Sequence, residues 1–80
     1  MTVPQVPEPL TTKAMVDWIY DSKKHRRDVA GLYAVALRMG PFVDVNFSAV
    51  NHAIISRWSP SGLKWIKALA WKAVTESEAY

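Results

Sequence analysis

The side chains best suited to bind another molecule lie near the C-terminal end of this sequence. Residues 63–75 read LKWIKALAWKAVT, and at about 100° per residue the Leu, Ile and several Ala side chains share one apolar face. The opposite face holds Lys64, Lys67, Trp71 and Lys72. Lysines beside an exposed aromatic ring can contact phosphates while the ring stacks on a base. They equally suit a partner protein with an acidic rim and an apolar pocket.

A second basic cluster, KKHRR, occupies residues 23–27. If these residues form the end of a helix and the connector after it, they are exposed to solvent, and the helix dipole favours their positive charges. As a functional feature it is a corner that contacts phosphates, or a patch resembling a nuclear-localisation signal. The solvated connector is the simpler interpretation. The candidate contact residues of this cluster are Lys23, Lys24, Arg26 and Arg27. Arg57, which lies shortly before residues 63–75, is a further candidate.

Side chains for catalysis or metal binding are not grouped in this sequence. Asp17 and Asp21 form a carboxylate pair at i, i+4, but acid–base chemistry would require burial or a metal to separate their roles. His25 and His52 are far apart, and there is no Cys. The sequence contains no nucleophile elbow, no HExxH and no Gly-rich phosphate loop. We therefore expect no enzymatic activity, no cofactor and no metal site.

Composition indicates one small domain with a basic body. The chain has 80 residues, of which half are hydrophobic, including four Trp, three Tyr and two Phe. All ten Lys and Arg fall within residues 13–72, which contain only four acids, so that segment carries +6 (ten minus four). Such charge favours a polyanionic or acidic partner. No segment reads as a signal peptide or a membrane span. We expect an intracellular protein, cytoplasmic or associated with a nucleoid or nucleus.

Helix signals place four helices along the chain. Thr11 or Thr12 can cap the first, Asp28 the second and Asn46 the third, and Ser59 can cap the fourth with Pro60 at its first position. The expected helices span about 12–22, 28–39, 46–58 and 60–75. Residues 12–39 could also form one long helix, although their two apolar stripes differ in phase.

The expected fold is a compact all-α four-helix bundle over residues 11–76. It follows a flexible Pro-rich arm (1–10) and precedes an acidic tail (77–80). Residues 41–45 form an irregular connector that packs Phe42 and Val45 into the core. The predicted core residues are Met15, Trp18, Ile19, Leu32, Ala36, Met39, Val50, Ile54, Trp58, Leu63, Ile66, Leu69 and Ala70.

The C-terminal pair, residues 46–75, resembles a helix-turn-helix unit in the length of its SPSG turn. Its last helix lacks the Arg, Asn and Gln side chains that read bases. Any recognition of the base sequence would come from residues elsewhere, such as Arg26, Arg27, Asn51 or Arg57. We expect a small nucleic-acid-binding module of low sequence specificity, with duplex DNA as its principal ligand.

The alternative function is a protein-interaction module that presents Trp71 and its lysines to an acidic partner. A homodimer is plausible if Trp71 pairs with its own copy. In a third arrangement, Trp71 folds against the rest of the domain and completes its core.

Overall fold

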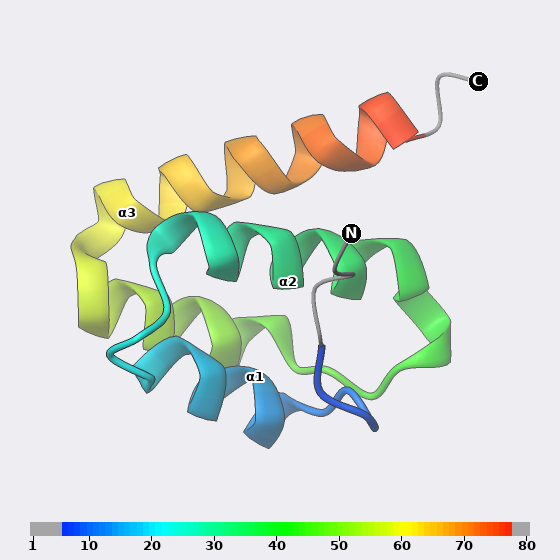
Figure 1. Ribbon diagram of the computed structural model, residues 1–80, viewed down its shortest axis with the longest axis horizontal. Coiled ribbons are helices and arrows are strands. Elements are labelled where there is room, and N and C mark those ends of the chain that lie inside the picture. Colours follow the sequence, from blue (N-terminus) through cyan, green and yellow to red (C-terminus); the bar gives the residue numbers. More distant parts are fainter. Residues whose placement is uncertain (1–5, 78–80) are drawn as a thin grey trace.

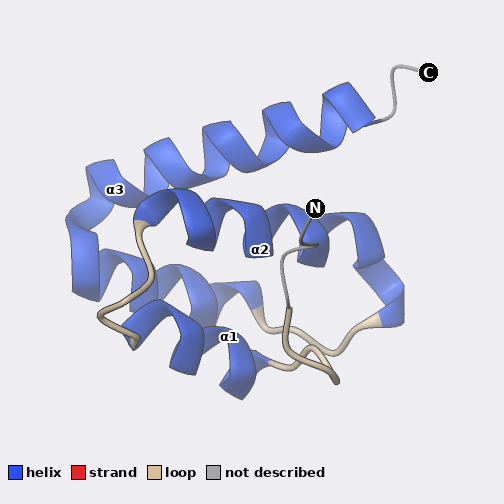
Figure 2. Cartoon of the chain, viewed as in Figure 1, coloured by secondary structure: helices blue, strands red, loops and turns tan. Residues whose placement is uncertain are grey.

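The computed structural model describes residues 6–77 as an all-α fold (Figure 1), which confirms the predicted fold class. Within these residues helices alternate with short loops (Figure 2). The elements are α1 (Thr12–Tyr20), α2 (Arg26–Met39), a 3₁₀ turn η1 (Gly40–Phe42) and α3 (Phe47–Ser77). Part of the predicted arm (1–5) and most of the predicted acidic tail (78–80) lie outside the described residues.

Helix α3 reverses the chain at a single residue. Ser59 has φ 85° and ψ 166°, and it divides α3 into a first arm (residues 47–58) and a second arm (60–77). The described residues therefore form three α-helices where four were predicted, but the two arms of the kinked helix correspond to the predicted helices 46–58 and 60–75. The predicted four-residue SPSG turn is wrong. Because Pro60 suits the first position of a helix, the second arm begins directly after Ser59.

Helix α1 begins where the sequence predicts it and ends earlier than expected. The Thr11 hydroxyl accepts a hydrogen bond from the Ala14 amide at 3.1 Å, which caps the helix. Asp21 is extended, and its carboxylate accepts from the Lys23 amide at 3.0 Å. This local side-chain bond offers the backbone an alternative to the helix. Residues 12–39 consequently form two helices rather than one.

Helix α2 starts two residues before the predicted position. His25 is its N-cap residue, and the Asp28 carboxylate accepts from the His25 amide at 2.8 Å. Asp28 therefore stabilises the first turn from the third helical position and does not cap the helix itself.

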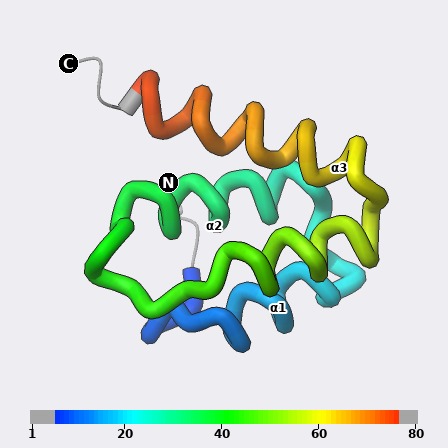
Figure 3. The backbone as a smooth tube through the Cα atoms, turned by 180° about the vertical axis from the view of Figure 1, so that it is seen from behind, coloured from blue at the N-terminus to red at the C-terminus, as the bar shows by residue number. Residues whose placement is uncertain are grey.

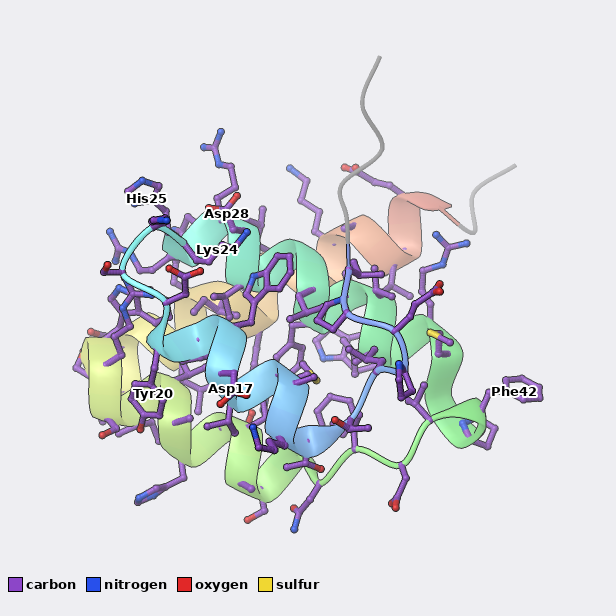
Figure 4. All side chains as sticks on the ribbon, turned by 60° about the horizontal axis from the view of Figure 1, so that its bottom comes forward. Asp17, Tyr20, Lys24, His25, Asp28 and Phe42 are labelled. Atoms are coloured by element: carbon purple, nitrogen blue, oxygen red, sulfur yellow. The ribbon has the colours of Figure 1, made fainter. Side chains whose placement is uncertain are left out.

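The connector after α2 directs an aromatic side chain into solvent. Gly40 has φ 47°, and Pro41 follows it in η1. Phe42 is 86% exposed and projects from the end of the molecule (Figure 4). Its predicted place in the core is therefore wrong, and so is that of Met39, which is 39% exposed. The chain turns away from the core at Gly40, so apolar character here does not lead to burial.

The core forms where α1 and the two arms of α3 pack around α2, which lies between α1 and the second arm in both Figure 1 and Figure 3. Among the predicted core residues, four are only half-buried: Trp18, Trp58, Leu63 and Leu69. Eight are buried: Met15, Ile19, Leu32, Ala36, Val50, Ile54, Ile66 and Ala70.

Polar links connect distant parts of the chain. The Thr12 hydroxyl accepts from the Asn46 amide at 2.8 Å, which joins the start of α1 to the start of α3. The Tyr33 hydroxyl donates to the Asn51 side chain at 2.8 Å, which joins α2 to the first arm. Leu10, before α1, is also buried against the core. None of the helices within residues 6–77 is both long and apolar enough to cross a membrane.

Candidate functional site

The second arm of α3 presents the predicted Lys and Trp side chains to solvent. Ile66, Ala70 and Val74 are buried at helical spacing on its inner face. On the outer face Trp71 is 51% exposed, so it does not complete the core. The three lysines of this arm, Lys64, Lys67 and Lys72, are exposed with it. The helical arrangement predicted from the sequence is therefore present.

Lys72 differs from the other two lysines of the second arm. Its ammonium lies 4.0 Å from the Glu76 carboxylate, one turn further along. Among residues 6–77 the only other such pair within 4 Å joins Lys13 to Asp17 on α1. The hydrogen bond between those two side chains raises the pKa of Lys13. Within the described residues, Lys64 and Lys67 have no carboxylate at that distance.

The basic cluster at residues 23–27 divides into members with different surroundings. Lys23 lies exposed in the turn before α2, and Arg26 and Arg27 lie exposed in the first turn of that helix. Lys24 is half-buried, with its ammonium 3.9 Å from the centre of the Trp18 ring. Part of its side chain therefore packs on α1, and its charge is less free to meet a ligand than that of its neighbours.

Arg57 links the kink of α3 to the end of α1. Its Nη1 donates to the carbonyl oxygens of Ile19 and Asp21 at 2.7 and 3.1 Å. Its guanidinium also lies 4.1 Å from the centre of the Trp58 ring. The last carbonyls of a helix have no partner within the helix, and a guanidinium satisfies them well. Arg57 therefore has a structural role in addition to its charge.

Arg26 connects the two predicted sets of basic residues. Its guanidinium lies 5.3 Å from the centre of the Trp65 ring on the second arm. The start of α2 and the start of the second arm are thus neighbours, although about forty residues separate them in the sequence. We give the name basic surface to five exposed cations: Lys23, Arg26 and Arg27 at or just before the start of α2, and Lys64 and Lys67 in the first two turns of the second arm.

A shallow depression borders the basic surface. Its lining residues are His25, Arg26, Arg27, Arg57, Trp58 and Trp65. The sequence pattern placed Trp58 in the core and Trp65 at the edge of the helix face, so it did not identify either as part of a site. The only sequence signal for these rings is their seven-residue spacing, which also fits an ordinary core stripe.

The remaining chemistry-bearing side chains are dispersed. Asp17 pairs with Lys13, Asp21 forms a turn, and His52 is exposed on the first arm. Residues 6–77 contain no group of three or more His, Cys, Asp or Glu that could hold a metal ion. None of the protein-family models, curated proteins or solved structures compared with this chain matches it.

Proposed function

We propose that this chain is a non-enzymatic nucleic-acid-binding module of low sequence specificity. The proposal depends chiefly on the contact between Arg26 and Trp65, because that contact places the start of α2, with Arg26 and Arg27, beside the start of the second arm, which carries Lys64. Lysine and arginine side chains without carboxylate partners are the usual contacts to backbone phosphates. The five cations of the basic surface fit this role.

The kink geometry bears on how such binding would occur. A DNA-binding helix-turn-helix joins its helices through a turn of three or four residues, whereas here Ser59 alone separates the two arms. The second arm also buries Ile66 and Ala70 against the protein and offers lysines outward. We therefore propose that the outer face of this arm contacts phosphates, without insertion of a recognition helix into a groove. Sequence specificity is then low, because phosphate contacts carry no base information.

The first test is a salt titration with a fluorescently labelled DNA duplex. Binding of the folded protein should weaken linearly on logarithmic axes as salt increases, because bound cations release counterions. The double variant Lys64→Ala, Lys67→Ala should lower the slope of that plot by about 2, one unit for each lost phosphate contact. The matched control is Arg38→Ala, an exposed cation in the last turn of α2. Absence of binding at low salt, or equal slopes for both variants, would refute the proposal.

A second candidate function is recognition of an acidic protein surface. The observation that favours it is Trp71, a large ring that is 51% exposed between Lys67 and Lys72. Exposed aromatic side chains are frequent anchors of protein interfaces. Trp71→Ala should abolish such an interaction and leave the salt slope for DNA unchanged. Binding of this kind should depend only modestly on salt, because an apolar anchor provides most of its free energy.

A further inference from the structure

The depression beside the basic surface lies at the end of the molecule where α2 begins and α3 reverses direction. His25, labelled in Figure 4, belongs to its lining at the start of α2. Trp58 precedes Ser59 and Trp65 follows it, so the kink contributes one ring from each arm to the same wall. The depression has a volume of about 500 Å³ and is open to solvent.

The charge of this depression is uniformly positive. Three of its six lining residues are arginines, Arg26, Arg27 and Arg57, and none is an acid. The nearest acid in the sequence, Asp28, accepts from the His25 amide and lines a different groove, beside Trp18. Uncompensated guanidinium groups favour an anionic ligand, and their planar forks match phosphate oxygens.

The same depression also offers flat apolar surface. Trp65 is 41% exposed, and Arg26 lies over part of its ring. The guanidinium of Arg57 lies over Trp58 at 4.1 Å and is held there by its bonds to the end of α1. Exposed indole and guanidinium planes are the groups on which unpaired bases stack.

The backbone at the kink is strained. Ser59, adjacent to Trp58, has φ 85° and ψ 166°, a region that only glycine adopts readily. Such strained conformations are concentrated at functional sites. Here the strained residue directly follows Trp58, one of the two rings of the depression.

We propose that this depression binds one unpaired nucleotide of a single-stranded nucleic acid. Arg26 and Arg27 contact its phosphate, and its base stacks against Trp65. In a duplex both faces of each internal base are covered by stacking, so a duplex can supply the phosphate but not the base. This inference rests on the proposed nucleic-acid binding, and it changes the preferred ligand from the duplex expected from the sequence to a single strand.

The test compares a labelled oligothymidylate with a blunt DNA duplex of equal length, both bound to the full chain and followed by fluorescence anisotropy. The wild type should bind the single strand more tightly. Trp65→Leu should weaken single-strand binding by roughly tenfold or more, as expected for loss of one stacked base, and leave duplex binding unchanged. The matched control is Trp71→Leu, which alters the other exposed ring of the second arm and should preserve the ratio of the two affinities.

Further variants keep the two proposals separable. Arg26→Ala combined with Arg27→Ala should weaken both ligands, and Trp65→Phe, which keeps a smaller ring, should restore part of the lost single-strand affinity. A wild type that prefers the duplex, or a Trp65→Leu protein with an unchanged affinity ratio, would overturn the inference while leaving nucleic-acid binding intact. Failure to bind either ligand would overturn both.

An oligouridylate of the same length distinguishes the two natural sources of such a strand. It carries the same phosphates and a pyrimidine ring, so its binding should show the same loss in Trp65→Leu. The tighter of the two wild-type complexes identifies the source as DNA or RNA. Unchanged binding of both strands to Trp65→Leu would overturn the stacking contact.

Discussion

The two arms of α3 belong to one helical element but are used in different ways. The first arm packs within the fold. Val50, Ala53 and Ile54 are buried on it, and side-chain hydrogen bonds tie Asn51 to α2 and Arg57 to the end of α1. It therefore connects the other two helices, and we expect much of the folding free energy to depend on it.

The second arm lies at the edge of the fold and contributes a narrower contact. Ile66, Ala70 and Val74 form one buried stripe, and the rest of its circumference is largely exposed. Lysines and two partly exposed tryptophans occupy that outer surface. The difference shows that hydrophobic residues of similar number can build a core in one arm and a contact surface in the next. Substitutions at matched sites test this division.

The largest expected effect comes from Arg57→Ala on the first arm. This change removes two charge-assisted hydrogen bonds to the end of α1, each of which contributes about 1.5–3 kcal/mol. The free energy of unfolding should fall by about 3 kcal/mol. Lys64→Ala on the second arm should change it by less than about 0.5 kcal/mol. Urea denaturation followed by circular dichroism measures both values, and similar losses would remove the distinction between the arms.

A smaller effect is expected where the arms meet. A Cβ atom added at Gly62 would lie 2.5 Å from the Trp58 Cβ, so Gly62→Ala must displace one arm from the other. We expect a loss of about 2 kcal/mol, as for other overpacked sites. The control is Gly31→Ala, where a Cβ meets nothing within 4 Å and the helix should gain up to about 1 kcal/mol.

Thermal denaturation of the two glycine variants should therefore shift the midpoint in opposite directions. A Gly62→Ala protein as stable as the wild type would show that the arms can separate without cost.

The smallest effect concerns the polar link between α2 and the first arm. Tyr33→Phe removes the hydrogen bond to Asn51 and should cost about 1 kcal/mol at neutral pH. Burial raises the pKa of Tyr33 in the folded protein. The unfolded chain therefore releases the tyrosine proton first, and stability should fall as pH rises above about 10.

This dependence should be flatter in Tyr33→Phe. Chemical denaturation at a series of alkaline pH values provides the comparison. Any slope left in the variant belongs to other groups that titrate there, such as Lys13, whose pKa is also raised. An identical slope in both proteins would mean that Tyr33 does not titrate differently on folding.

Features that depend on neighbouring residues along the chain were predictable from the sequence. The Thr11 cap of α1 is present, and the Asn46 side chain accepts from the Ala49 amide at 3.3 Å at the start of α3. The apolar stripe of the second arm was also correct, and with it the outward direction of Trp71. Each of these follows from helical periodicity and from hydrogen bonds three or four residues apart.

Features that depend on contacts across the fold were not predictable. Arg57 reads as one more surface cation until the end of α1 is placed beside it, and the proximity of Arg26 and Trp65 has no local signal. Phe42 shows the opposite error, because its apolar side chain suggested burial while the turn at Gly40 directs it outward. Position in space, rather than residue type, determined all three outcomes.

The kink at Ser59 also governs whether both arms remain in the same chain. A straight helix of 31 residues would extend about 46 Å, whereas the longest dimension of the protein is 35 Å. The second half of such a helix would extend beyond the rest of the domain. Only another copy of the protein could then cover the buried stripe of the second arm, as in a domain-swapped dimer. Pro60 opposes this exchange. Inside a continuous helix its ring would clash with the Ser56 carbonyl, at a cost of about 3 kcal/mol, so one proline favours intramolecular closure over exchange between copies.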